Sequence, residues 1–134
     1  HPVMVERKIT QLLDEINSIR KESKVGHLKR SMILEKAAMS HSRDMAKQGH
    51  LTHNSSDDLS FKSRMRKQGV RMAAMAENIG CGPPEPKTIL KEWLNSQEHR
   101  ANMLDRQYRF VGLGVAFHPE HHCNWFWTAI FSGK

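Results

Sequence analysis

The sequence predicts an α+β fold, in which helices occupy most of the chain and antiparallel strands close it. Near the start, apolar residues recur every three or four positions, as they do on one face of a helix. Near the end, two short runs rich in valine, phenylalanine and tryptophan flank a hairpin loop. Strands do not alternate with helices along the chain. We therefore expect a layered domain rather than a sheet built from βαβ units.

Two long amphipathic helices are expected first, over Val3–Lys21 and Ser31–Gln48. The first residue of the second helix is close to an N-cap arrangement, and Gly49 is a suitable residue to stop it. His41 lies on the apolar face of this helix and is interpreted as a core residue with a hydrogen-bond partner. Its neighbour Ser42 is expected to be solvated.

The middle of the chain predicts a short helix, a strand and a break. Leu59–Lys67 is the helix, and Gly69 follows its end. Met72–Gly80 is apolar and predicts a strand that enters a turn. Gly82–Pro86 contains three prolines and predicts a rigid break.

The remaining segments predict two further helical pieces and two strands. Lys87–Ser96 is a helix, and His99–Leu104 is a short helix or turn. Val111–His118 and Asn124–Ser132 are strands joined by the loop Pro119–His122. Four polar residues at this loop could bind a metal, but a solvated loop is the better interpretation: His118, Glu120, His121 and His122.

Length and charge limit the classes of protein that fit. Its length of 134 residues predicts a single domain over residues 1–134. The sequence has no run of 18 apolar residues, so no transmembrane helix is predicted. Because it begins His1-Pro2, the chain is expected to be a mature or trimmed fragment. The net charge of +7 suits anionic lipids, glycans or proteins as partners, or no specific anionic partner. No nucleic-acid-binding signature accompanies the charge.

The basic residues and methionines around the short third helix allow a second interpretation. The basic residues, Lys62, Arg64, Arg66, Lys67 and Arg71, have one aromatic neighbour, Phe61, so base stacking is not expected. Met65, Met72 and Met75 could form a soft surface for peripheral contact with lipid, or could fill irregular gaps in the core. Trp93, Trp125 and Trp127 are expected to pack in the core, although an exposed strand tryptophan would mark a ligand groove.

Two cysteines, Cys81 and Cys123, each adjoin a predicted strand. Neighbouring strands could bring them within bridging distance, which predicts a disulfide. The alternative is two free, buried thiols that behave as small apolar residues. No spacing typical of a structural zinc finger occurs.

Four segments in fixed order carry the strongest functional signal. They are His50-Leu51-Thr52-His53-Asn54, Ala76-Glu77-Asn78-Ile79-Gly80, Trp93-Leu94-Asn95-Ser96-Gln97-Glu98-His99-Arg100-Ala101-Asn102, and Val111-Gly112-Leu113-Gly114-Val115. With the aromatic strand Trp125-Phe126-Trp127-Thr128, they resemble the CAP superfamily, which comprises cysteine-rich secretory proteins, antigen 5 and pathogenesis-related protein 1 and is also called the SCP domain. The resemblance covers Ile9 to Ser132 and is closest to the compact bacterial-type members.

The resemblance implies a three-layer α–β–α sandwich with a central, mainly antiparallel sheet. It also implies a cleft in which His53 and His99 are the two histidines and Glu77 is an acidic residue. Many eukaryotic members carry a second glutamate where this chain has Ser96. The serine is common in bacterial-type members, so its presence leaves the fold expectation intact. It puts in doubt any mechanism that needs two carboxylates.

Each cleft residue has more than one interpretation. His53 and His99 could bind zinc or another divalent metal with water completing the shell, or could belong to a hydrogen-bonded cluster without tight metal binding. Glu77 is a candidate catalytic base, or a structural acid bonded to backbone amides, but orientation of a histidine is favoured. Ser96 lies three residues before His99, as a nucleophile could, but a helix cap is the better interpretation because no nucleophile-elbow motif is present.

Three functions follow from these interpretations. The favoured one is a secreted or envelope-associated module, at the cell surface or in the periplasm, that binds a lipid, envelope polymer or protein without catalysis. The alternative is a metal-dependent hydrolase or protease that uses His53, His99 and Glu77. A third is an assembly role in which surface loops bind a partner protein.

Overall fold

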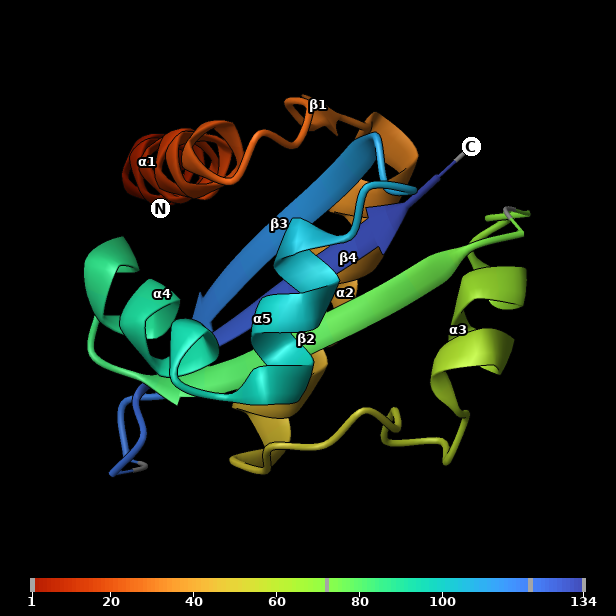
Figure 1. Ribbon diagram of the computed structural model, residues 1–134. Coiled ribbons are helices and arrows are strands. Elements are labelled where there is room, and N and C mark those ends of the chain that lie inside the picture. Colours follow the sequence, from red (N-terminus) through yellow and green to blue (C-terminus); the bar gives the residue numbers. More distant parts are fainter. Residues whose placement is uncertain (1, 72, 121, 134) are drawn as a thin grey trace.

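The chain folds into a four-stranded sheet with helices on both faces (Figure 1). The computed structural model describes residues 2–71, 73–120 and 122–133. The elements in chain order are α1 (Pro2–Glu22), β1 (Lys29–Arg30), α2 (Met32–Gln48), α3 (Phe61–Lys67), β2 (Met75–Gly82), α4 (Pro86–Leu94), α5 (Gln97–Leu104), β3 (Phe110–Phe117) and β4 (Trp125–Ser132). This mixture of helices and strands confirms the predicted α+β class.

The differences from the predicted elements are small and have local causes. Helix α3 begins at Phe61 rather than at Leu59, because the Ser60 side chain accepts a hydrogen bond from the Ser63 amide and caps the helix there. Strand β2 begins at Met75, and Met72, where the prediction placed its start, lies outside the described residues. Strand β1 has two residues and leaves no periodic pattern in the sequence.

The strand order is β1-β3-β4-β2. The pairs β3–β4 and β2–β4 are antiparallel, whereas the short β1 pairs in parallel with β3. This confirms the mainly antiparallel sheet. Strands β1 and β2 lie at opposite edges, so the residues near them face different sides of the molecule.

Alternation along the strands divides the core into two layers of side chains. One face of the sheet packs against α1, α4 and α5, and its centre includes Leu113, Trp127 and the α4 residue Trp93. The other face packs against α2 and α3, through Ile130, Leu34 and Met65 among others. Figure 1 shows the same division, with α4 and α5 in front of the sheet and α2 behind it. The arrangement is the predicted three-layer sandwich.

The Gly-Leu-Gly pattern of β3 lets α2 approach the sheet at backbone distance. A Cβ atom on Gly114 would lie 2.6 Å from the backbone of Ala38, which is closer than real Cβ atoms approach other heavy atoms. A Cβ on Gly112 would clash with the backbone of Leu34 and Glu35. Two glycines of the motif therefore serve the packing of α2 rather than the chemistry of a site.

Helix α2 ends as predicted but is more buried than expected. The Ser31 side chain accepts from the Leu34 amide, and Gly49 closes the helix in the left-handed conformation. The expectation that Ser42 is solvated is wrong. Its hydroxyl is fully buried against the sheet, 2.7 Å from the Thr128 hydroxyl, so each satisfies the other's hydrogen-bonding group.

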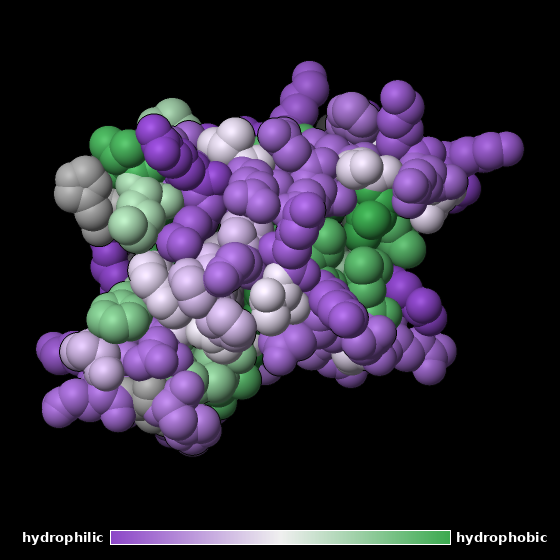
Figure 2. Space-filling view, turned by 90° about the vertical axis from the view of Figure 1, so that its left-hand side faces the viewer, coloured by the Kyte–Doolittle hydropathy of each residue, from purple (hydrophilic) through white to green (hydrophobic). Residues whose placement is uncertain are grey.

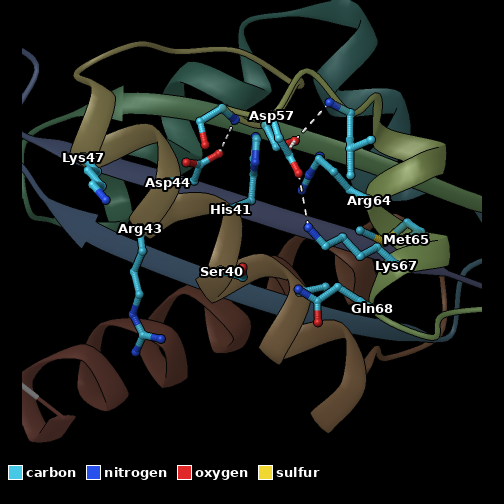
Figure 3. Close-up of a pocket in the computed structure, with 14 residues that line it drawn as sticks. Ser40, His41, Arg43, Asp44, Lys47, Asp57, Arg64, Met65, Lys67 and Gln68 are labelled. Atoms are coloured by element: carbon cyan, nitrogen blue, oxygen red, sulfur yellow. Dashed lines mark hydrogen bonds and ion pairs between the residues drawn. The ribbon is translucent and has the colours of Figure 1, made fainter.

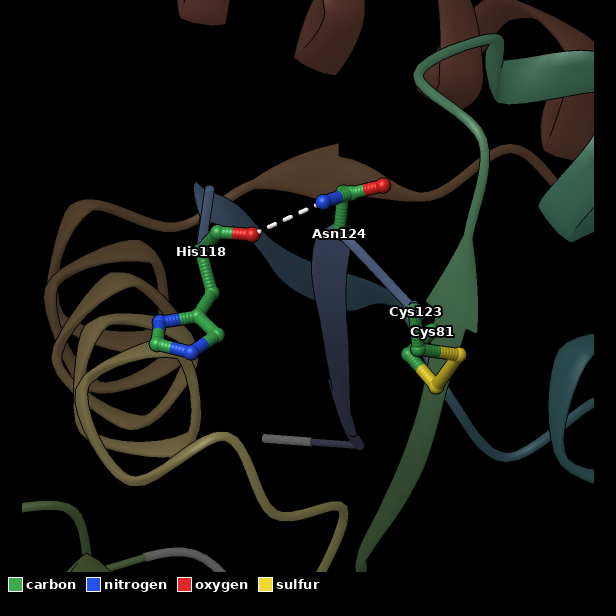
Figure 4. Close-up of a disulfide and its surroundings, with 4 residues drawn as sticks. All are labelled: Cys81, His118, Cys123 and Asn124. Carbon is green, nitrogen blue, oxygen red and sulfur yellow. Dashed lines mark hydrogen bonds between the residues drawn. A yellow bond between two sulfur atoms is a disulfide. The ribbon is translucent and has the colours of Figure 1, made fainter. Parts of the chain in front are cut away.

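Cys81 and Cys123 form the predicted disulfide, with their Cα atoms 5.4 Å apart (Figure 4). The bond ties β2 to the hairpin loop that leads into β4. Beside it, the Asn124 side-chain amide donates to the His118 carbonyl and closes the hairpin. The half-cystines are 42 positions apart, and closing a loop of that length stabilises the fold by about 4 kcal/mol in the chain-entropy treatment.

Met65 and Met75 do not form the methionine surface proposed around α3, and Met72, the third residue of that prediction, lies outside the described residues. Met65 is 1% exposed and packs in the core, and Met75 is partly buried against the same cluster. The tryptophans follow the core prediction at Trp93 and Trp127. Trp125 is only partly buried, and it lies 5.0 Å from the exposed Phe117 ring, centroid to centroid.

Figure 2 shows one side of the molecule as largely hydrophilic, with apolar side chains in separate patches rather than one continuous area. Exposed apolar residues at the start of α1, Val3 and Met4, and at the end of β3, Phe117, are among the large apolar side chains that remain accessible. Among the described helices, none has the length and apolar character needed to cross a bilayer.

Candidate functional site

Glu77, on edge strand β2, is the centre of the polar cluster that the sequence singled out. Its side chain is 1% exposed and accepts hydrogen bonds at both carboxylate oxygens. Arg64 on α3 donates to Oε1 and Oε2, at 3.0 and 2.8 Å, in a bidentate ion pair that is itself buried. Such planar, charge-assisted pairs fix the orientation of both groups.

His53 completes the cluster from the loop that follows α2. Its Nδ1 lies 2.8 Å from Glu77 Oε1, and its side chain is 49% exposed. Arg64 also donates to the His53 carbonyl at 2.9 Å. One guanidinium thus holds both the carboxylate and the backbone that carries the histidine. We refer to His53, Arg64 and Glu77 as the His–Arg–Glu cluster.

The electrostatics of the cluster keep Glu77 ionised. Burial raises the pKa of Glu77, but the hydrogen bonds from His53 and Arg64 and the positive charge of Arg64 outweigh it, so the net shift is downward. An ionised carboxylate only accepts hydrogen bonds. The proton between the two groups therefore belongs to His53 Nδ1. When the ring is neutral, its Nε2 keeps a free lone pair.

His41 and Arg64 are site residues that the sequence reasoning missed. The His41 Nε2–H donates to the Thr52 carbonyl at 2.6 Å, next to His53, and so ties the loop to α2. Burial is the largest effect on the pKa of His41 and lowers it, which favours the neutral ring. The prediction that His41 is a core residue with a hydrogen-bond partner is confirmed for its Nε2 atom only. Within the described residues, the buried His41 Nδ1 has no hydrogen-bond partner.

The sequence did contain a signal for Arg64. Phe61, Arg64 and Met65 occur at i, i+3 and i+4, the spacing of one helix face. Since Phe61 and Met65 pack toward the core, Arg64 must point inward with them. The same charge at Arg66 faces solvent.

The backbone of His99 lies on the other side of β2. Successive strand residues point to opposite faces, so Asn78 faces α5 whereas Glu77 faces α3. The Asn78 amide donates to the His99 carbonyl at 3.0 Å and accepts from Asn102 at 2.9 Å. These bonds dock the start of α5 on the strand. Among the described contacts, none joins the His99 ring to His53 or Glu77.

Ser96 lies at the N-cap position of α5, in extended backbone, as its interpretation as a cap requires. Its hydroxyl makes no capping hydrogen bond. Nor does any described hydrogen bond join it to a histidine, so the arrangement of a serine nucleophile with a base is not formed.

The donor atoms that the described residues offer fit a divalent metal poorly. His53 Nε2 is available, and a metal-binding histidine commonly donates its other nitrogen to a carboxylate, as here. Both oxygens of Glu77, however, are engaged and buried. Across the described part of the chain, no group of three or more histidine, cysteine or acidic side chains is arranged to hold an ion. That statement includes the described hairpin residues His118, Glu120 and His122, whereas His121 lies outside them.

A polar cavity of about 480 Å³ adjoins the cluster between α2, α3 and the loop that joins them (Figure 3). His41 and Arg64 contribute to its wall. Its two carboxylates are already engaged: Asp44 accepts from the Ser56 amide at 2.7 Å, and Asp57 pairs with Lys67 at 3.2 Å. The lining also includes Arg43 and Lys47, which make no ion pair among the described residues, so the cavity is polar and carries a net positive charge.

Comparison with known proteins agrees with this fold. The chain is 29% identical over 129 residues to the uncharacterized protein YkwD of Bacillus subtilis, covering 96% of this chain and 47% of that protein. It resembles the crystal structure of an extracellular protein containing a SCP domain from Bacillus anthracis, with a TM-score of 0.87 at 27% identity, over 97% of this chain and 41% of the other. An outer surface protein from Borrelia burgdorferi has the same fold, with a TM-score of 0.85 at 20% identity, over 96% and 93% of the two chains.

The chain thus spans about half the length of the Bacillus relatives or less. A family model described as the cysteine-rich secretory protein family, CAP, matches residues 13–131, which is most of the chain. This range includes the His–Arg–Glu cluster, the disulfide and all four strands apart from Ser132, the last residue of β4. The chain therefore belongs to the CAP family of cysteine-rich secretory proteins.

Proposed function

We propose that this chain is an extracellular or cell-envelope binding module that presents His53 to a ligand and does not catalyse a reaction. The observation that carries the proposal is the enclosure of Glu77. A general base must reach the proton that it removes. Glu77 is 1% exposed, and both its oxygens accept hydrogen bonds, so its role is to orient His53.

The ligand would meet His53 through its exposed edge. The ring is fixed at Nδ1 by Glu77, and its backbone is fixed by Arg64 and, one residue earlier, by His41. A preorganised polar group of this kind loses little conformational entropy on binding. The adjoining polar cavity supplies further donors and acceptors, which favours a polar ligand such as a glycan or a protein loop over a lipid chain.

The location outside the cell is supported by two independent features. Disulfides persist mainly in oxidising compartments, and Cys81 and Cys123 form one. The similar Bacillus anthracis protein is described as extracellular. Both features are compatible with a periplasmic or a surface position.

A metal-dependent hydrolase is the second candidate, and one observation favours it. With Nδ1 hydrogen-bonded to a carboxylate, His53 has the orientation common to metal-binding histidines. The hydrolase would need His99 or other donors to complete the shell, with Glu77 beside the metal-bound water. Zinc retention and peptide hydrolysis therefore discriminate between the two functions.

The test compares His53→Ala with His50→Ala, an exposed histidine of the same loop, as the matched control. Each is titrated with soluble glycans of the envelope type, a surface-protein extract and vesicles, and each is analysed for bound zinc. We expect His53→Ala to weaken glycan or protein binding by about tenfold or more, while His50→Ala stays within about twofold. Stoichiometric zinc together with peptide hydrolysis that is lost in both His53→Ala and Glu77→Gln would instead establish the hydrolase.

A further inference from the structure

A second cavity lies at the β1 edge of the sheet, across the molecule from β2 and the His–Arg–Glu cluster. It has a volume of about 470 Å³ and is formed by the loop after α1, strand β1 and the segment between α5 and β3. Its lining includes five basic residues, Arg20, His27, Lys29, Arg106 and Arg109. No acidic residue is among the described residues that line it.

The exposed cations of this cavity lack the carboxylate partners that two other exposed basic residues have. Arg30, in the same strand as Lys29, is paired with Glu6 and Glu35, and Lys67 is paired with Asp57. In the described part of the chain, Lys29, Arg106 and Arg109 make no ion pair. The nearby Asp105 carboxylate is turned to Gln107, accepting from its backbone and side-chain amides at 2.9 Å each.

The backbone beneath these cations is rigid because Arg20 clamps it. This buried guanidinium donates to four carbonyl groups, those of Gly26, Met103, Asp105 and Tyr108. The bonds join the segment after α1, which leads through His27 into Lys29 of β1, to the segment that carries Arg106 and Arg109. Arg106 strengthens the link by donating to the Lys24 carbonyl at 3.1 Å. The clamp also turns four carbonyl oxygens inward, so these acceptors do not compete for the cavity.

We propose that this cavity binds phosphate groups carried on an anionic polymer chain. The guanidinium groups of Arg106 and Arg109 suit phosphate because a guanidinium can donate two parallel hydrogen bonds to its oxygens, and Lys29 adds a compact positive charge. The partly buried Phe110 and the buried Tyr108 provide an apolar wall for the units between phosphates. The cations line a concavity rather than a flat face, which favours a polymer segment over a membrane surface. This site is independent of whatever His53 binds.

The test uses tripolyphosphate as a compact probe and a glycerol-phosphate oligomer as a polymer probe. Binding is followed by calorimetry and by amide chemical shifts. The double variant Arg106→Gln/Arg109→Gln is expected to weaken the binding of both probes by about tenfold or more. The control Lys62→Gln/Arg66→Gln removes the same charge from exposed positions of α3, near the opposite edge of the sheet. It is expected to weaken probe binding by less than about threefold. Shifted amides should cluster at residues 26–29 and 106–110.

Three outcomes would overturn the proposal. If the two double variants weakened probe binding equally, the effect would come from the net charge of the protein and not from this cavity. Binding to vesicles of anionic phospholipid without binding to either soluble probe would assign the surface to a membrane. Absence of binding in all arms would leave no phosphate site. His53→Ala should bind both probes like the unaltered chain, so failure here is separate from failure of the proposed function.

Discussion

Replacing Arg64 with methionine is expected to lower the free energy of unfolding by about 3–5 kcal/mol, because it leaves the buried Glu77 carboxylate without its positive partner. It also removes the hydrogen bond to the His53 carbonyl. Urea unfolding at neutral pH measures the loss. Arg66→Met, an exposed neighbour on the same helix, should change stability by less than about 0.5 kcal/mol.

The double variant Arg64→Met/Glu77→Leu separates pairing from packing. If the cost of Arg64→Met comes from an unpaired charge, removing that charge should restore much of the stability, and the two single losses should not add. Additive losses would show that Arg64 stabilises through its apolar contacts instead. They would remove the argument that Arg64 holds Glu77 ionised.

The penalty should also depend on pH, with a sign that follows from Glu77. Its folded pKa lies below the ordinary 4.5, so in acid the unfolded chain binds a proton more readily than the folded chain does. The stability contributed by Glu77 is therefore present above pH 4.5 and lost as the pH falls through the lower, folded value. In Arg64→Met the carboxyl can protonate more easily, so the difference from the unaltered chain should shrink in acid.

Replacing Arg20 with methionine should be comparably damaging, at about 4 kcal/mol, for a different reason. Arg20 makes no ion pair among the described residues, yet it is 1% exposed and satisfies four carbonyl groups. Burial lowers the pKa of Arg20, with Asp105 partly opposing the shift. Each orphaned buried carbonyl costs on the order of 1 kcal/mol or more.

Thermal or urea unfolding of Arg20→Met, beside the exposed Arg43→Met as control, measures this effect. Arg20→Lys should recover only part of the loss, since one ammonium group has three donors and cannot reproduce the planar geometry. A variant Arg20→Met as stable as the control would mean that water replaces the guanidinium. The clamp would then not be what rigidifies the basic cavity.

The sequence predicted the fold well because the helices and strands obey strong local rules. Residues close together in the sequence determine the periodicity of α1, the two ends of α2 and the aromatic strand β4. The disulfide followed from two cysteines beside two strands. Strand β1 could not be predicted, because two residues carry no periodicity and its pairing with β3 depends on the path of the loop before it.

The site could be predicted only in part, because a motif does not say which way each residue faces. His53 and Glu77 came from the motif order, and they do lie in contact. Arg64 lies outside the quoted segments and was grouped with its surface neighbours by charge alone. Asn78, Asn102 and the two β3 glycines belong to the motifs but hold α5 and α2 in place. Much of the motif therefore maintains the fold.

The three side chains of the His–Arg–Glu cluster differ in their exposure to solvent. The groups that fix the cluster are buried, whereas His53 alone among its three side chains is substantially exposed. Under the proposed function, ligand specificity would come from His53 and the loops around it, including the walls of the adjoining polar cavity.

The most direct test of the central claim is an NMR titration of the Glu77 carboxyl carbon together with the ring nitrogens of His53. A Glu77 pKa below 4.5 and a neutral His53 ring with its proton on Nδ1 are the results that a buried, orienting carboxylate predicts. A Glu77 pKa at or above 4.5, together with a neutral His53 ring that carries its proton on Nε2, would contradict it. Glu77 would then again be a candidate catalytic base.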